Sequence, residues 1–254
     1  MNQHSGHEMH YEKQQQHGAA QDYSTMVQWN VDPESPMAER ESIIQIKVTD
    51  TTGSAVASFA TVHEKQLHLL AISRDLSIFQ HLHPSYQGDG IFTVKATFPK
   101  GGEYRLFADF TPAGGTQQLA IFELSVKGDG EAQTVHPDKN LVKTVKDLQF
   151  SLEIPNLQLK EHIPMTFTVK DQAGKPVDTL EPYLGSVGHI VIVSQDLTQF
   201  LHAHPVDESV TGPSVEYMTS FPIAGIYKIW GQFKKNGQVY TVPFTIQVPD
   251  IAEG

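Results

Sequence analysis

The sequence predicts an all-β protein made of two tandem, immunoglobulin-like antiparallel β-sandwich domains that arose by internal duplication. The first observation is that short stretches of the chain alternate Val, Ile, Phe or Tyr with polar residues, which is the pattern of half-buried strands. The second is that Gly, Pro, Asn and Asp bound these stretches, and no segment keeps the 3.6-residue apolar period of a helix. The third is that the second half of the chain repeats the first.

The repeat is recognised by segments that match at nearly constant spacing. Two pairs of segments are separated by an offset of 121 residues and a third pair by 123, so the second copy contains two extra residues. A period of this length is that of a domain, not of a solenoid repeat. The matching segments are 48–56 with 169–177, 75–84 with 196–205, and 98–110 with 221–233.

Each copy contains several expected strands within about 100 residues, which is typical of a sandwich of the immunoglobulin type. In the first copy they lie at 42–48, 66–72, 91–98, 103–110 and 119–126. In the second copy they lie at 165–169, 188–194, 214–221, 227–233 and 240–248. The pair Asn236-Gly237 predicts a tight hairpin between the last two. Only RDLSIFQ and QDLTQFL are compatible with a single helical turn, with Asp75 and Asp196 as its capping residues.

The domain boundaries follow from this pattern and from composition. Residues 1–25 are expected to form a disordered, His-rich tether, because they lack apolar periodicity. Its histidines, together with Met1 and Met9, predict weak copper binding. The polar, Pro- and Gly-containing stretch after the first copy is expected to be a linker. We therefore assign repeat 1 to 26–127, the linker to 128–144 and repeat 2 to 145–250.

Composition excludes several function classes. The net charge of −11 argues against a nucleic-acid partner, because binding phosphates requires an excess of Lys and Arg. The absence of cysteine excludes disulfides, thiolate metal sites and Cys nucleophiles. No run of about 20 apolar residues is present to span a membrane, so we expect membrane contact only through a lipid anchor, if one is attached.

Two His-x-His pairs carry the strongest chemical signal. In an extended strand, residues i and i+2 point to the same face, so His81 and His83 can share one ion. His68 lies in the preceding strand, and the turn between them can bring all three together. Three imidazoles without a thiolate suit copper(II), with zinc(II) as the alternative, and leave one coordination position open. The second copy repeats the arrangement, so we expect two metal sites: His68, His81 and His83 in repeat 1, and His189, His202 and His204 in repeat 2.

The alternative interpretation is that these histidines only pack in the strands and brace the hairpins. The two copies favour ligands, since Leu82 is replaced by Ala203 and Gln80 by Leu201 while the histidines are kept.

Other repeated or neighbouring residues are given lesser roles. His63 has a leucine as its counterpart and is interpreted as accessory. Asp109 corresponds to Gln232, which makes it a poor candidate for a shared ligand. The repeated aromatic pairs are expected to anchor the two cores: Phe79 with Phe200, Tyr104 with Tyr227, and Phe107 with Trp230.

The segments HLLAISRDLSIFQHLHP and GHIVIVSQDLTQFLHAHP, with the His- and Met-containing start, resemble small exported β-sandwich proteins associated with copper and other heavy metals, the YtkA-like group. The resemblance covers roughly residues 40–248. It implies a protein outside the cytoplasm, secreted or lipid-anchored, that handles metal. The chain departs from copper-carrying sandwiches in having few methionines within its domains, which argues against copper(I) there.

The favoured function is therefore a non-enzymatic, extracytoplasmic metal-binding protein that buffers copper or delivers it to another exported metal-handling protein. A structural or adhesive tandem sandwich without metal, and a three-histidine metalloenzyme, remain as alternatives. No Glu or Asp recurs beside the histidines as a general base, so we expect no enzymatic activity.

Overall fold

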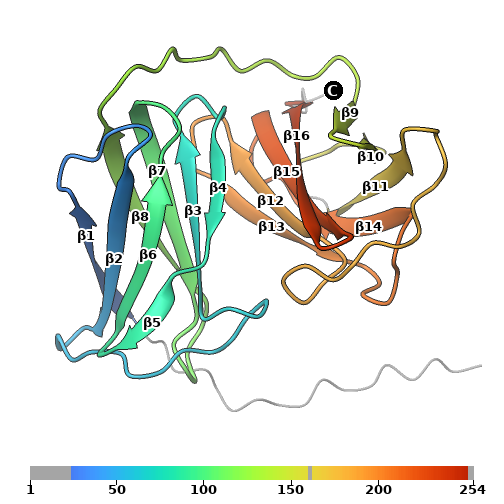
Figure 1. Cartoon of the computed structure of the whole chain (residues 1–254). Helices are drawn as coiled ribbons and strands as arrows, with labels where there is room; N and C mark the ends of the chain where they lie inside the picture. The colour runs from blue at the N-terminus through green and yellow to red at the C-terminus, as the bar shows by residue number, and fades with distance from the viewer. Residues whose placement is uncertain (1–23, 160–161, 251–254) are drawn as a thin grey trace, which may run out of the picture.

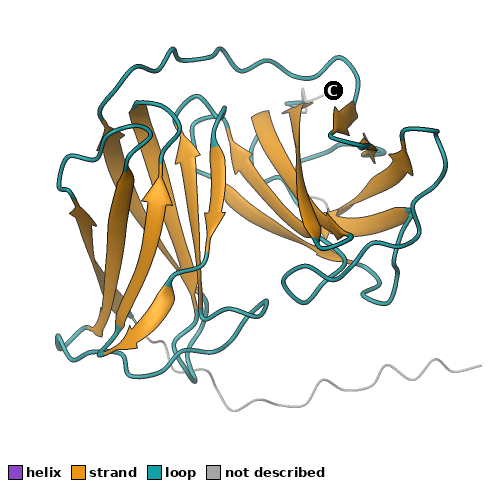
Figure 2. Ribbon diagram, in the orientation of Figure 1, coloured by secondary structure: helices purple, strands orange, loops and turns teal. Residues whose placement is uncertain are grey.

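The computed structural model describes residues 24–159 and 162–250. Within these residues the chain is all-β, as predicted: strands are joined by loops and turns (Figure 2). The strands of the first half are β1 (Thr25–Asp32), β2 (Glu41–Asp50), β3 (Leu67–Ser73), β4 (Phe79–Leu82), β5 (Ser85–Gly88), β6 (Ile91–Thr97), β7 (Gly102–Phe110) and β8 (Gln118–Val126). Those of the second half are β9 (Val142–Val145), β10 (Leu148–Glu153), β11 (Ile163–Asp171), β12 (His189–Ser194), β13 (Phe200–Pro205), β14 (Ser214–Thr219), β15 (Gly225–Lys235) and β16 (Gln238–Val248). The described residues include no helix that could cross a membrane.

The first half forms a sandwich of two antiparallel four-stranded sheets, with the orders β1-β2-β6-β5 and β4-β3-β7-β8. Alternate residues of each sheet point into the space between them, because side chains alternate along a strand. Ile44, Ile46 and Phe92 of one sheet thereby meet Leu67, Leu69 and Leu106 of the other in one buried core. The predicted alternation of apolar and polar residues thus produces the core.

The second half forms a similar sandwich, but its strands pair continuously in the order β16-β15-β12-β13-β14-β11-β10-β9. The continuity comes from β13, which pairs with β12 through residues 200–203 and with β14 through 204–205. In the first half the corresponding stretch is divided into β4 and β5, one in each sheet. The histidine pair of each copy therefore lies where the chain passes from one sheet to the other.

A buried tyrosine fastens the same corner of each sandwich. The hydroxyl of Tyr104 donates to the carbonyl of Lys100 at 2.8 Å, and that of Tyr227 donates to the carbonyl of Ile223 at 3.0 Å. Both rings are fully buried, which confirms them as core anchors. A tyrosine that bonds back to the main chain a few residues upstream is a feature of immunoglobulin-like sandwiches.

The two sandwiches dock through the sheets that contain β3 and β12, which face each other in Figure 1. Every residue of both strands is buried, so each strand is covered on two faces. One face of β3 lies in its own core, whereas Leu70 and Ile72 on the other face pack with Val191 and Val193 of β12.

Two aromatic stacks cross this interface. Phe79 stacks on Trp230 with ring centroids 4.6 Å apart, and Phe107 stacks on Phe200 at 5.0 Å. Phe79 corresponds to Phe200 and Phe107 to Trp230, so the contacts are reciprocal, as in a two-fold symmetric dimer. The four rings anchor a hydrophobic core, as predicted, but it is not the core of either single sandwich. They instead join the sandwiches, because the sheet faces that carry them bury each other.

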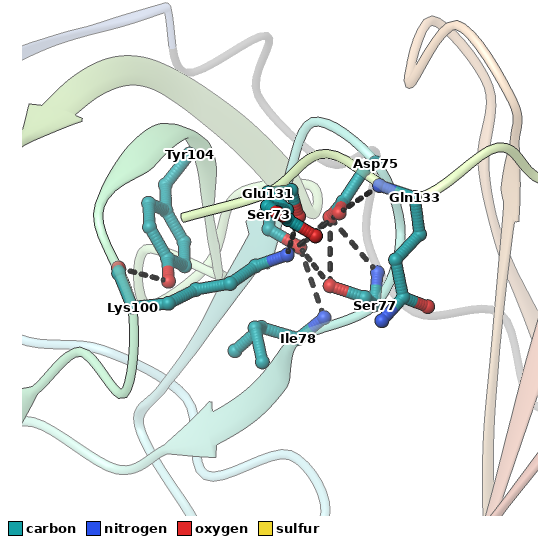
Figure 3. A network of polar contacts seen from close by, with 8 residues as sticks. All are labelled: Ser73, Asp75, Ser77, Ile78, Lys100, Tyr104, Glu131 and Gln133. Atoms are coloured by element: carbon teal, nitrogen blue, oxygen red, sulfur yellow. Dashed lines mark hydrogen bonds and ion pairs between the residues drawn. The ribbon is translucent and has the colours of Figure 1, made fainter. Parts of the chain in front are cut away.

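The turn between β3 and β4 is held by Asp75 (Figure 3). Its carboxylate accepts hydrogen bonds from the hydroxyl groups of Ser73 at 2.6 Å and Ser77 at 2.8 Å and from the backbone N–H of Ser77 at 3.2 Å. Asp196 accepts the equivalent bonds in the second copy. Both aspartates accept backbone bonds as expected, but in hairpin turns and not at helix starts.

Asp75 also fastens the segment that connects the sandwiches. Its second carboxylate oxygen accepts from Lys100 Nζ at 2.6 Å and from the backbone N–H of Gln133 at 2.9 Å. At the other end, Asp138 accepts from the backbone N–H of Thr245 at 2.8 Å. The connecting segment, which arches above both sandwiches in Figure 1, is therefore bonded to each of them.

Asp75→Asn tests this junction. Burial raises the pKa of Asp75, but the hydrogen bonds from Lys100, Ser73, Gln133 and Ser77 outweigh burial and hold the pKa well below its usual value. The charged form therefore stabilises the fold above about pH 4, and this stabilisation is lost as the pH falls further. We expect the substitution to lower the free energy of unfolding at pH 7 by about 1–2 kcal/mol. Urea unfolding at pH 7 and pH 3 should show the difference shrinking in acid, whereas exposed Asp178→Asn should change neither value.

Trp230→Ala tests the docking of the sandwiches. The indole is almost fully buried, and emptying such a site costs about 3–5 kcal/mol. Trp29→Ala is the matched control, since Trp29 is half-buried and stacks on Phe122 within the first sandwich. Unfolding followed by circular dichroism should show less than half the effect for the control. Equal effects would mean that the interface adds little to stability.

Candidate metal centre

The structure brings together the three histidines predicted for repeat 1. His68 lies on β3, on the face that turns toward the second sandwich, and is 5% exposed. His81 lies on β4 and His83 follows it, so the hairpin returns both toward His68. Each of the three rings offers a nitrogen that lies within 4.8 Å of the other two.

The hydrogen bonds of His68 and His81 indicate which nitrogen of each ring carries the proton. His68 Nε2 lies 2.9 Å from the carbonyl of Val62, an acceptor, and must therefore donate to it. His81 Nδ1 lies 2.8 Å from Oε1 of Gln232, also an acceptor, and must donate in the same way. The remaining nitrogens, His68 Nδ1 and His81 Nε2, lie 3.0 Å apart.

This arrangement brings two acceptor nitrogens together when both rings are neutral. If both imidazoles are neutral, each has already given its one proton to an oxygen outside the pair. The two inner nitrogens then present lone pairs to each other, and these lone pairs repel. A proton or a metal ion shared by His68 Nδ1 and His81 Nε2 removes the repulsion.

The separation of these nitrogens fits two ligands of one ion. Imidazole nitrogens bind zinc at about 2.0–2.1 Å, so two nitrogens 3.0 Å apart could both reach one ion. Val62 and Gln232 serve as outer hydrogen-bond partners, which commonly orient metal-binding histidines.

His83 provides a third nitrogen suited to an ion. Its Nε2 is buried and has no hydrogen-bond partner among the described residues. Burial, together with His68 and Lys65, lowers the pKa of His83 to about 4. The ring is therefore neutral at physiological pH, which is the state that binds metal.

The histidines of repeat 2 are only partly described. His189, at the start of β12, is 7% exposed and lies against the first site: its ring centroid is 4.8 Å from that of His81 and 5.9 Å from that of His68. The side chains of His202 and His204 lie outside the described residues. The second site, at His189, His202 and His204, therefore stays a prediction, and the ring of His189 lies beside the histidines of repeat 1 across the interface.

A small pocket of about 90 Å³ opens onto His68 from solvent. His63, Asp109, Gln117 and His189 contribute to its walls. Both carboxylate oxygens of Asp109 accept from Gln117 Nε2 at 2.8 Å. The pocket gives small solutes access to the His68 ring.

Two residues at this site were not predicted from the sequence to contact the three histidines. His63, interpreted as accessory, packs its ring 6.2 Å from that of His68 and 5.7 Å from that of His189. Gln232 entered only as the counterpart of Asp109, yet it bonds to His81 across the interface. The sequence does contain a signal for the contact between the sandwiches. The residues of β3 and β12 form almost unbroken apolar runs, which indicates strands buried on both faces.

The solved structures to which the chain is similar are distant in sequence and in structure. FdeC, an Escherichia coli adhesin, is 20% identical over 92% of this chain and 66% of that one, with a TM-score of 0.31. Invasin, a bacterial integrin-binding protein, is 12% identical over 89% of this chain and 40% of that one, with a TM-score of 0.25. The chain spans less than two thirds of each.

Comparison with curated proteins finds no relative. A family model does match, once in each sandwich, over residues 20–128 and 143–250. The chain therefore belongs to the family described as a domain of unknown function, DUF8832, of which it carries two copies.

Proposed function

We propose that the protein binds a divalent metal ion through His68, His81 and His83, with copper(II) as the favoured ion and zinc(II) as the alternative. The observation that carries the proposal is the 3.0 Å separation of His68 Nδ1 and His81 Nε2, when the other nitrogen of each ring donates to an oxygen. The buried Nε2 of His83 supports it. Three imidazoles without a thiolate suit copper(II) or zinc(II).

The role we infer is buffering or delivery of the ion outside the cytoplasm. The His- and Met-containing N-terminus and the resemblance to the YtkA-like group support this inference. The pocket beside His68 would allow exchange with solvent or with another metal-handling protein. We expect no catalytic turnover, since no carboxylate belongs to the three-histidine group in the described part of the chain.

A structural role is the second candidate, and a specific observation favours it. His68 and His81 make hydrogen bonds to Val62 and Gln232 that would brace the hairpin and the interface without any metal. The two functions make different demands on His83. Metal binding uses its Nε2 as a ligand, whereas a structural role does not need it, because this buried nitrogen makes no hydrogen bond with the described residues.

Removing two ligands tests metal binding. The double substitution His81→Ala and His83→Ala should lower the number of tightly bound copper(II) or zinc(II) ions by one per chain, measured by equilibrium dialysis and metal analysis. The difference from the unmodified protein is the relevant quantity, because it cancels ions held by the N-terminal histidines. His136→Ala is the control, since His136 is exposed. Equal stoichiometry in all three proteins would contradict the proposal.

Single substitutions distinguish ligands from braces. In metal-free protein, His68→Ala removes the hydrogen bond to the Val62 carbonyl and a buried ring, and should cost about 1–3 kcal/mol of stability. His83→Ala breaks no hydrogen bond of the buried Nε2 with the described residues and should cost less than about 1 kcal/mol, while lowering metal affinity at least about tenfold. Urea unfolding and isothermal titration with zinc(II) measure the two effects. A large loss of stability with unchanged affinity in His83→Ala would favour the structural role.

A further inference from the structure

We propose that Gln232, a residue of the second sandwich, is a positioning residue for His81, so that metal binding by the first sandwich depends on the docking of the second. This inference rests on the proposed function, because it concerns the same three histidines. His68, His81 and His83 all belong to the first sandwich. The acceptor of the 2.8 Å hydrogen bond from His81 Nδ1 is Gln232 Oε1, which belongs to the second sandwich.

The bond decides which nitrogen of His81 is available to an ion. With Gln232 Oε1 as acceptor, the single proton of neutral His81 sits on Nδ1, and the lone pair of Nε2 points toward His68. Without that acceptor, the proton can move to Nε2 and form a hydrogen bond with His68 Nδ1. That second arrangement is satisfied without metal, and it removes both nitrogens as ligands.

Gln232 is itself held in the required orientation. Its side chain is 5% exposed on β15, and its Nε2 donates to Thr241 Oγ1 on β16 at 3.3 Å. The amide nitrogen is thereby directed away from His81 and the oxygen toward it. A buried, oriented amide selects one tautomer without adding charge to the site.

The bond exists only while the sandwiches are docked, and other contacts hold them together. The ring of His189 covers His68 and His81 from the second sandwich. Arg105 Nη1 donates to the carbonyl of Leu197 at 2.7 Å, and Arg74 Nη1 to that of Asp196 at 3.0 Å. Since coupling between two binding events is reciprocal, an ion held by the three histidines should in turn strengthen the docking.

A matched pair of substitutions in the full chain tests the positioning role. Gln232→Leu has a similar volume but no acceptor, whereas Gln232→Glu keeps an acceptor at the same reach. Zinc(II) is the probe, measured by competition with a chromophoric chelator. We expect Gln232→Leu to weaken zinc binding by about 10- to 100-fold, the usual effect of losing an outer partner of a metal ligand. Gln232→Glu should restore affinity to within about threefold of the unmodified protein, and exposed Gln149→Ala should leave it unchanged.

Failure of the inference is distinguishable from failure of the proposed function. If the unmodified protein binds no zinc(II) or copper(II) at the three histidines, the proposed function fails. If it binds but Gln232→Leu binds equally well, only the positioning role is overturned. Equal weakening in Gln232→Leu and Gln232→Glu would also overturn it, because a mere packing role predicts no rescue by an acceptor.

The dependence on docking has its own test in Arg105→Ala. This substitution removes a contact to the second sandwich, and Arg105 makes no hydrogen bond to the histidines in the described contacts. We expect it to weaken zinc(II) binding severalfold. Folding is checked through Trp230, which is the only tryptophan left in a Trp29→Phe background. Unchanged affinity in folded Arg105→Ala protein would refute the dependence on docking.

Discussion

The structure depends on the burial of β3 and β12 on both faces. A strand in a single sandwich covers one face with its own core and leaves the other to solvent. Here the second face of each strand is apolar as well, and each of the two sheets buries the apolar face of the other when the sandwiches dock. Exposing these faces separately would leave a large contiguous apolar patch on each sandwich, which soluble domains avoid. The aromatic stacks and the histidine cluster both follow from this contact.

The docking also sets the chemistry of the histidines. They occupy the end of the interface, where His68 is next to the apolar residues of β3 and is largely shielded from water. Shielding disfavours charged imidazolium, as the lowered pKa of His83 illustrates. Neutral imidazoles with oriented lone pairs are poor partners for one another and good ligands for a metal ion. The same burial that stabilises the fold therefore prepares the site.

Most of the fold could be predicted from the sequence, because it rests on local patterns. The alternation of apolar residues located ten of the sixteen strands that the described residues form. The repeated decamer with His68 upstream located the three histidines that meet in repeat 1. The relation between the repeats could not be predicted in this way. It depends on which sheet faces bury each other, and no periodicity within one copy records the partner of Phe107 or the position of His189 beside His81. The bond from His81 to Gln232 joins residues 151 positions apart.

Duplication within one chain explains why the two halves of this interface are free to differ. In a dimer of identical subunits, a change at one position appears on both sides of the two-fold axis. In a tandem repeat each side changes alone, and the equivalent positions Asp109 and Gln232 have diverged into an acid and a neutral amide. The amide bonds to His81, whereas the acid bonds to Gln117 at the pocket beside His68. The repeats thus share a scaffold and an aromatic contact, while the residues around their histidines have taken different chemical roles.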